Sequence, residues 1–260
     1  MDITLSELPS DDEITLTCSR ILASGTEDVL SYHTGGTAVV AISHQLVVKF
    51  GAAVTFDEFN NQTIACQLLS QSESVRVPQP YYFFQRDHIG FIVMDYVTTE
   101  MAPPYEHVSA ERVVALLHVF ATIVSNKPGS LSGGPCRGLL WSDHHDFTPE
   151  KIHDIEKYFS KRLPGVSDVT LNAYPAVLHH GDLATRNLII KGDQMYVLDW
   201  ASAGYFPKLF EVAAMQRNAE EPLLLNVLQL IRSTAWLSEE ERAQANHVVK
   251  AADSNIRYVV

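Results

Sequence analysis

The sequence is poor in cysteine and in basic residues, and each shortage excludes a class of protein. Three cysteines, at positions 18, 66 and 136, form no Cys-x-x-Cys or Cys/His pattern, so neither a zinc site nor a disulfide framework is expected. Lysine and arginine number 19 against 31 aspartates and glutamates, a net charge of -12. This balance argues against a nucleic-acid partner and against an anionic membrane surface. It is compatible with a cationic small molecule, although acidity also serves solubility alone.

Long apolar runs are also missing. The longest, residues 113–124, is too short to span a bilayer and contains His118. The first residues lack the basic region and apolar core of a signal peptide, so we expect a soluble cytoplasmic protein without a membrane partner. Only the first dozen residues have the polar composition of a disordered segment. A hydrophobic share of 46% over 260 residues is enough for a full core in one large domain or two small lobes.

The first third of the chain has the pattern of a β-sheet lobe. Residues 28–51 predict two or three short strands, interrupted by the Gly35-Gly36 pair. Residues 57–70 carry apolar side chains at helical spacing. Two further strands are expected around a turn at residues 87–90. Together these elements predict a β-rich lobe over residues 1–95, built from an antiparallel sheet and one main helix.

The remainder, residues 96–260, predicts a mainly helical lobe. Helices are expected where a capping residue precedes an apolar run. The fold class is therefore α+β, with two lobes. The expected helix starts are Ser109, Thr148 with Pro149 in the first helical position, and Ser238, which forms a capping box with Glu241.

Three oxygen-bearing side chains lie close together between residues 177 and 204. Asn187 precedes one strand-like run and Asp199 ends the next, and the two runs are joined by a short hairpin turn. This pairing would hold both residues at the same end of two strands, where an amide and a carboxylate oxygen suit Mg²⁺. Asp182 is left as a base or an orienting group. Each residue alone could simply cap a turn, but capping does not explain the joint spacing.

These segments resemble those of a known family. The run HGDLATRN, residues 180–187, resembles the catalytic loop of kinase-like phosphotransferases, with Gly where protein kinases carry Arg. The run LDWASAG, residues 198–204, resembles their metal-binding segment in the Asp-Trp form of the aminoglycoside phosphotransferase and choline kinase-like superfamily. With LVVKFG and FIVMDYV the pattern is similar to the fungal-type proteins over residues 30–215. The resemblance implies a protein-kinase-like fold that uses ATP, or alternatively GTP, with Mg²⁺. It also implies that residues 1–95 form the nucleotide-binding lobe and that residues 96–260 carry the catalytic loop and the acceptor site.

The resemblance also implies roles for the central residues. Asp182 would take the proton of the acceptor hydroxyl, and Asn187 with Asp199 would hold the magnesium ion. Lys49 would hold the nucleotide phosphates and would itself be fixed by an ion pair with Glu58. Asp57, the neighbour of Glu58, competes for that last role.

Further positions are implied with supporting or nucleotide-binding roles. His180 would bond the backbone near Asp199, and Arg186 would either reach a phosphate or pack against the protein. The glycine pair would form the turn over the phosphates, although a plain hairpin turn explains it equally well. Two hinge residues would meet adenine through backbone groups. The nucleotide-binding positions so implied, besides the Lys49–Glu58 pair, are Gly35, Gly36, Met94 and Tyr96.

The acceptor is expected to be a small molecule with a hydroxyl group. The segment between Asp199 and Glu211 is too short for the activation segment of a protein kinase. Asp143 and Glu211 offer acidic groups for an amine-bearing acceptor, or else are solvated or capping residues. Ala201 stands where fungal relatives often carry an acidic residue. Two function classes therefore remain, namely an ATP- and magnesium-dependent small-molecule kinase, and an inactive kinase fold that binds a ligand or partner.

Overall fold

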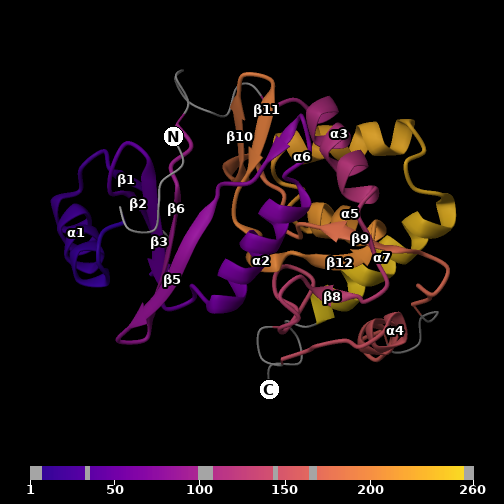
Figure 1. Cartoon of the computed structure of the whole chain (residues 1–260). Coiled ribbons are helices and arrows are strands. Elements are labelled where there is room, and N and C mark those ends of the chain that lie inside the picture. The colour runs from indigo at the N-terminus through magenta and orange to yellow at the C-terminus, as the bar shows by residue number, and fades with distance from the viewer. Residues whose placement is uncertain (1–7, 33–35, 99–107, 143–145, 164–168, 255–260) are drawn as a thin grey trace.

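The computed structural model describes residues 8–32, 36–98, 108–142, 146–163 and 169–254, and it has the two-lobed α+β architecture of protein kinases (Figure 1). Of the predicted site residues, Gly35 and Asp143 lie outside the described ranges. Within those ranges, no helix combines the length and the apolar character needed to cross a membrane.

The N-terminal lobe is built on a five-stranded sheet of order β1-β2-β3-β6-β5, in which every neighbouring pair is antiparallel. The strands that the sequence predicts around residues 28–51 and around the turn at 87–90 are confirmed. Alternation of side chains gives the sheet two apolar faces. The strands are β1 (Val29–Tyr32), β2 (Ala38–Ala41), β3 (Leu46–Gly51), β5 (Pro80–Arg86) and β6 (Ile89–Asp95).

One face of the sheet is covered by α1 (Asp11–Ser24), a second helix in this lobe that the sequence prediction did not include (Figure 1). Ile14 and Cys18 of α1 pack in a buried cluster with β-strand residues of the sheet. Within the segment that has the composition of disorder, Ser10 is a helix cap and Asp11 and Asp12 begin the helix, whereas residues 1–7 lie outside the described ranges. Ser10 Oγ accepts the backbone N–H of Glu13 at 3.4 Å, and the Glu13 carboxylate accepts the Ser10 N–H at 2.8 Å.

The opposite face is covered by α2 (Phe56–Leu68), the predicted helix of this lobe, which lies between the sheet and the helical lobe (Figure 1). The hydroxyl of Thr55 caps its first turn. Phe59 of α2 packs against a buried cluster that includes Val47 and Ile92 of the sheet. Lys49 follows Val47 by two residues on β3, so its side chain projects from the same face toward α2.

The C-terminal lobe is mainly helical, and α5 packs on α7 while α3 packs on α6. The predicted caps at Ser109 and Ser238 are confirmed, since the Ser109 and Ser238 hydroxyls accept backbone N–H groups of the first turns. The helices are α3 (Ala110–Ala121), α4 (Ile152–Ser160), α5 (Leu209–Arg217), α6 (Pro222–Ser233) and α7 (Glu239–Ser254).

The start of α4 corrects the prediction that this helix follows Thr148 directly. The helix begins at Ile152. The Asp154 carboxylate accepts the backbone N–H groups of Glu150 and Lys151, both at 3.1 Å. An acidic side chain in the first turn thus satisfies the donors ahead of the helix, which fixes its start three residues later than a Thr148 cap would.

Two small sheets position the polar residues between β9 and β12. The predicted hairpin is confirmed as β10 (Leu188–Lys191) antiparallel to β11 (Gln194–Val197), and β4 (Val75–Arg76) from the N-terminal third pairs parallel to β11. In the second sheet, β9 and β12 are antiparallel neighbours, so the loops that follow β9 and precede β12 lie side by side. The strands of this sheet are β7 (Val124–Ser125), β8 (Gly129–Ser130), β9 (Ala176–His179) and β12 (Gly204–Pro207).

Candidate active site

The loop after β9 and the segment after β11 form one connected polar site. The hairpin register places Leu188 opposite Val197, and the Leu198 N–H donates to the Asn187 carbonyl at 2.8 Å. The strand pairing therefore places Asn187 beside the residue that precedes Asp199. This agrees with the geometry expected from the sequence, in which both residues lie at the same end of two paired strands.

Lys49 joins this site from the other lobe. Its Nζ lies 2.5 Å from Glu58 Oε1 and 2.8 Å from Asp199 Oδ1. The side chains of Lys49 and Glu58 are only 12% and 4% exposed, so the charges face one another with little water between them. The competing residue Asp57 lies elsewhere, with a carboxylate oxygen 2.7 Å from the position that a Cβ at Gly134 would occupy. The partner of Lys49 is therefore Glu58.

The charged groups of this cluster shift one another's pKa values. Burial by itself lowers the pKa of Lys49, but the charges of Asp199 and Glu58 outweigh it and raise that pKa above its ordinary value. Burial raises the pKa of Asp199, and the nearby Lys49 ammonium more than reverses this, so its pKa lies below the ordinary value. Burial also raises the pKa of Glu58, with Lys49 opposing the shift.

The backbone of Asp199 is held in a conformation that non-glycine residues rarely adopt. Its φ of 63° and ψ of 72° are left-handed. The segment is fixed on both sides, by His180 Nε2 at 2.9 Å from the Leu198 carbonyl and by Asn61 Nδ2 at 3.2 Å from the Trp200 and Ala201 carbonyls. Such local strain, of order 1–3 kcal/mol, persists where surrounding contacts enforce it and is concentrated at functional sites.

The carboxylate of Asp182 is surrounded by nitrogen donors. Arg186 Nη2 lies 2.8 Å from Oδ1 and 2.6 Å from Oδ2. Asn187 Nδ2 donates to Oδ2 at 3.1 Å and to the Asp182 carbonyl at 2.8 Å, and Asn218 Nδ2 donates to Oδ1 at 3.2 Å. The carboxylate is thus fixed in place by a cation and two amides. Because the Asn187 amide nitrogen is turned onto Asp182, its amide oxygen points away from that residue.

His180 acts within the protein as a neutral hydrogen-bonding group. Burial lowers its pKa below the ordinary value, although the charges of Glu211, Asp182 and Asp199 oppose that shift. Its Nε2 faces the Leu198 carbonyl, which can only accept, so this nitrogen carries the hydrogen. Its Nδ1 then accepts the backbone N–H of Asp182 at 3.3 Å. One ring therefore ties the Asp182 loop to the segment of Asp199.

Glu211, which is expected to contribute to acceptor binding, lies beneath the Asp182 loop. Its side chain is buried, and its carboxylate accepts the backbone N–H of His180 at 2.7 Å and that of Gly181 at 3.1 Å. It also lies 3.0 Å from His179 Nδ1. Burial raises the pKa of Glu211, but its neighbours, His179 first, bring that pKa below the ordinary value. Glu211 therefore anchors the loop that carries Asp182, from beneath.

A glycine is required in this loop. Gly181 has a φ of +83°, and a Cβ there would lie 2.8 Å from His179 Nε2 and 3.0 Å from Ser202. Both the backbone conformation and the close approach of the neighbouring segment exclude a side chain. The Gly of the His-Gly-Asp run thus lets the loop lie directly on the Trp200–Ser202 turn.

The residues expected around the nucleotide are more dispersed. Gly36 has a φ of +82° in the connection between β1 and β2, which fits a hairpin turn as well as a phosphate loop. Met94 is buried, and Gln62 Nε2 lies 3.3 Å from its sulfur. The Tyr96 N–H donates to the Gln45 carbonyl at 2.7 Å, so this N–H is engaged within the lobe and is not available to an adenine ring.

Two asparagines of the site are missed by sequence reasoning. Asn61 lies one helical turn after Glu58 on α2, and its Oδ1 accepts the Ser132 N–H at 2.7 Å while its nitrogen reaches the Asp199 segment. Its spacing of three positions from Glu58, which places both side chains on one face of the helix, is a signal that could identify it. Asn218 ends α5, far along the chain from Asp182, and no local pattern marks it.

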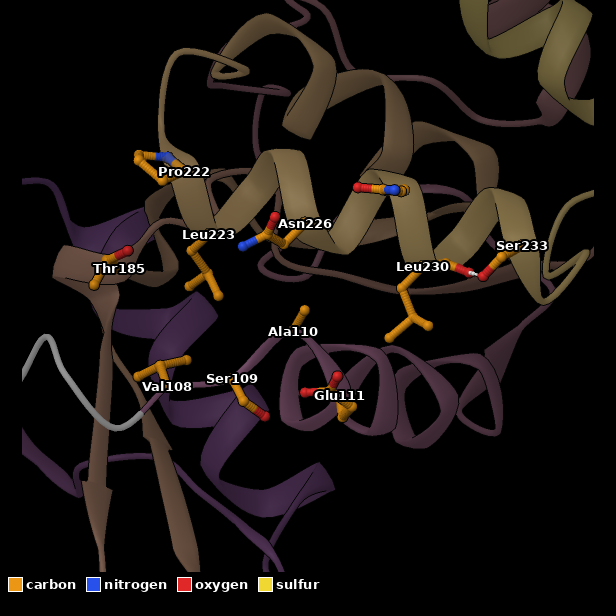
Figure 2. A pocket seen from close by; sticks show the side chains of 11 residues that line it. Val108, Ser109, Ala110, Glu111, Thr185, Pro222, Leu223, Asn226, Leu230 and Ser233 are labelled. Atoms are coloured by element: carbon orange, nitrogen blue, oxygen red, sulfur yellow. Dashed lines mark hydrogen bonds between the residues drawn. The ribbon is translucent and has the colours of Figure 1, made fainter.

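A groove borders the Asp182 loop between α3 and α6 (Figure 2). Its volume is about 740 Å³, within the roughly 300–1,000 Å³ of small-molecule sites. Leu223 and Leu230 extend from α6 toward α3, and Thr185 of the loop closes one end. Glu111 on α3 supplies a carboxylate, whose pKa is lowered by its own backbone N–H and by the Ser109 hydroxyl. The groove is thus partly apolar, with an anionic group on one wall.

Comparison with known proteins gives a family and a fold. The sequence model described as the phosphotransferase enzyme family matches residues 20–244. No curated protein matches the chain.

Among solved structures, a thermostable mutant of aminoglycoside phosphotransferase APH(4)-Ia, in a ternary complex with AMP-PNP and hygromycin B, is similar with a TM-score of 0.61 at 12% identity, over 93% of this chain and 89% of that one. The streptomycin-ATP complex of APH(2")-IIa is similar with a TM-score of 0.56 at 16% identity, over 96% of this chain and 91% of that one. The GDP and kanamycin complex of APH(2")-IIIa is similar with a TM-score of 0.54 at 13% identity, over 93% of this chain and 90% of that one. At these identities the likeness establishes the fold.

Proposed function

The chain belongs to the phosphotransferase enzyme family, and we propose that it is a small-molecule kinase that transfers the γ-phosphoryl group of ATP to a hydroxyl of an amine-bearing metabolite. The observation that carries this proposal is the connected set of contacts from Lys49, through Asp199 and Asn187, to Asp182. Phosphoryl transfer depends mainly on positioning and on neutralising phosphate charge, and this set supplies both kinds of group.

Asp182 is the residue we assign to the acceptor. A carboxylate fixed by neighbouring amides can accept a hydrogen bond from the acceptor hydroxyl and take its proton as the new bond to phosphorus forms. The loop beneath it is fixed by Glu211 and by His180, so the carboxylate keeps its position during the reaction. We assign the role of base to Asp182 because its carboxylate can accept a proton and because its loop is held in place.

Lys49, Asn187 and Asp199 are the residues we assign to the nucleotide and its metal ion. Among the described residues no group of three or more His, Cys, Asp or Glu side chains could hold a metal, but Mg²⁺ takes few protein oxygens and keeps several waters. The Asn187 amide oxygen, turned away from Asp182, and the Asp199 carboxylate form a suitable pair. Mg²⁺ held there would neutralise phosphate oxygens. Lys49 would exchange its bond with Asp199 for the nucleotide phosphates while Glu58 keeps its stem in place.

The groove between α3 and α6 is the place we assign to the body of the acceptor. Its apolar wall suits a carbon skeleton, and Glu111 suits an ammonium group. Thr185, three residues after Asp182, brings the groove to the catalytic loop. With Glu211 buried beneath that loop, Glu111 is the acidic group in the described part of the chain that lines this groove.

The direct test is ATP consumption with Mg²⁺ against a panel of hydroxylated amines, amino acids and sugars. We expect turnover with one chemical class, and a loss of about 10²–10⁴-fold in Asp182→Asn, the range that a positioned base contributes. The acceptor so found should bind more weakly to Glu111→Gln, with the maximal rate retained. Equal turnover in wild type and Asp182→Asn would remove the basis of the proposal, and so would the absence of Mg²⁺-dependent turnover across the whole panel.

A further inference from the structure

The guanidinium of Arg186 lies directly in front of the Asp182 carboxylate. A single nitrogen, Nη2, is 2.8 Å from Oδ1 and 2.6 Å from Oδ2. A nitrogen within hydrogen-bond distance of both oxygens must lie between them, on the open side of the carboxylate. This is also the side from which a hydroxyl approaches to give up its proton.

The remaining acceptor positions of Asp182 are taken as well. Asn218 Nδ2 is 3.2 Å from Oδ1, and Asn187 Nδ2 is 3.1 Å from Oδ2. Each carboxylate oxygen therefore has two nitrogen donors, and a carboxylate has about four lone-pair positions in all. A hydroxyl from a substrate or from water can bond to Asp182 only after one of these donors leaves.

Arg186 is the donor that leaves at the lowest cost. Asn187 is buried, and its amide is also bound to the Asp182 carbonyl at 2.8 Å. Asn218 is half-buried at the end of α5, where its backbone N–H closes the last turn. The side chain of Arg186 is 49% exposed, so water can replace the hydrogen bonds that it gives up.

We infer that Arg186 is a positioning residue that guards Asp182 against water, so that the nucleotide is consumed only when an acceptor in the adjoining groove displaces the guanidinium. This inference rests on the proposed function of Asp182 as the base. Such a guard would serve a small-molecule kinase, because water is always present and is itself a competing phosphoryl acceptor. Arg186 thus discriminates between water and the acceptor by controlling which of them reaches Asp182. When Arg186 leaves, Asn187 and Asn218 still hold the Asp182 carboxylate in place.

The reaction that the guard suppresses is hydrolysis of the nucleotide. A water oxygen forms the bond to the γ-phosphorus while the bond from that phosphorus to the bridging oxygen breaks. One proton of the water goes to the Asp182 carboxylate, and the products are ADP and inorganic phosphate. No other reactant is needed, so the test requires only ATP, Mg²⁺ and water.

The experiment measures phosphate release from ATP and Mg²⁺ with no acceptor added. In Arg186→Ala we expect release to rise at least about 10-fold, part of the 10²–10⁴-fold that a positioned base provides. Arg186→Lys, which keeps a cation but loses the planar fork, should fall between Arg186→Ala and wild type. The double variant Asp182→Asn/Arg186→Ala should return to the wild-type rate or below it.

Arg137→Ala is the matched control. Arg137 Nη2 lies 2.6 Å from Asp146, and its side chain is 42% exposed, so this variant removes a comparable exposed ion pair that does not include Asp182. Its phosphate release should equal that of wild type. Affinity for AMP-PNP with Mg²⁺ and the unfolding temperature are measured for every variant, and both should be retained in Arg186→Ala.

Unchanged or slower phosphate release in Arg186→Ala, with AMP-PNP affinity retained, overturns the inference. A rise that persists in the double variant overturns it too, because Asp182 would then not be the group that was guarded. Loss of AMP-PNP affinity in both Arg186→Ala and Arg186→Lys would show that Arg186 serves the nucleotide instead. These outcomes leave the proposed function standing if the acceptor panel still shows turnover that depends on Asp182.

Discussion

The two ion pairs of the candidate site differ in burial and in the distance along the chain between their partners. Lys49 and Glu58 are 12% and 4% exposed and come from different elements of the N-terminal lobe, and Asp199 joins them from the other lobe. Asp182 and Arg186 are 20% and 49% exposed and lie four residues apart in one loop. A buried pair is costly to break because each charge depends on its partner, whereas an exposed pair exchanges with water at little cost. The first is suited to hold a position, and the second is suited to open.

The largest effect is therefore expected from Lys49→Met. This change leaves the carboxylates of Glu58 and Asp199 near each other without their cation, and removing one partner of a buried pair costs about 3–5 kcal/mol. We expect the free energy of unfolding in urea to fall by about 3 kcal/mol and the affinity for AMP-PNP with Mg²⁺ to be lost. The double change Lys49→Met/Glu58→Gln should recover part of the stability but none of the affinity. A fully stable Lys49→Met protein would contradict the buried network.

Glu211→Gln should come next in size. The neutral amide can keep only some of the contacts that the carboxylate makes with the His180 and Gly181 N–H groups and with His179. Hydrogen bonds to a charged group contribute about 1.5–3 kcal/mol, so we expect a loss of about 2 kcal/mol in urea unfolding. Turnover should fall while the acceptor KM stays constant, because Glu211 lies beneath the loop. A raised KM with normal stability would restore a role for Glu211 in acceptor binding.

A smaller effect is expected from pH through His180. Its pKa is lowered in the folded protein by burial, against the opposing charges of Glu211, Asp182 and Asp199, while the unfolded chain titrates near the ordinary value of 6.5. The unfolded state thus binds more protons, so stability is present above that value and is lost as the pH falls below it. Between pH 7 and 5.5 we therefore expect the free energy of unfolding to decrease as the pH falls. His180→Asn should show a shallower decrease in unfolding free energy over this range, and an unchanged slope would show that His180 does not titrate there.

Asn218→Ala should have the smallest effect. It tests how much Asn218 contributes to holding the Asp182 carboxylate of the exposed ion pair. The bond from Asn218 to Asp182 is 3.2 Å long and partly exposed, so its loss should cost less than 1 kcal/mol, or about threefold in kcat. KM for the acceptor should be unchanged. Equal loss in kcat and in thermal stability would indicate that Asn218 supports the end of α5 and has no effect on Asp182.

Most of the fold could be predicted from the sequence because the local signals in the sequence agree with the tertiary structure. The hairpin of β10 and β11, the caps at Ser109 and Ser238, and helix α2 were all legible from spacing and capping residues. Helix α1 was missed although its capping box, Ser10 with Glu13, stands in the sequence. Its acidic first turn resembles a disordered segment in composition, and only the apolar spacing of residues 14, 18 and 21 distinguishes it.

The site was only partly predictable for a different reason. Lys49, Glu58, Asn187 and Asp199 lie in motifs whose spacing is readable along the chain. Burial and long-range contacts are not readable in that way. From the sequence alone, an acidic residue after the Asp-Trp segment is equally consistent with an exposed position that binds an amine and with a buried one. Only the packing shows that Glu211 is buried beneath the Asp182 loop.

Every role proposed for the site requires that the residues around Asp199 bind a nucleotide together with Mg²⁺, and calorimetry with AMP-PNP tests this binding without knowledge of the acceptor. We predict binding to wild type with Mg²⁺, and affinity at least about 10-fold weaker both in Asp199→Asn and in wild type without the metal, as expected when a ligand of a metal-nucleotide complex is removed. Equal affinity under all three conditions would contradict the account.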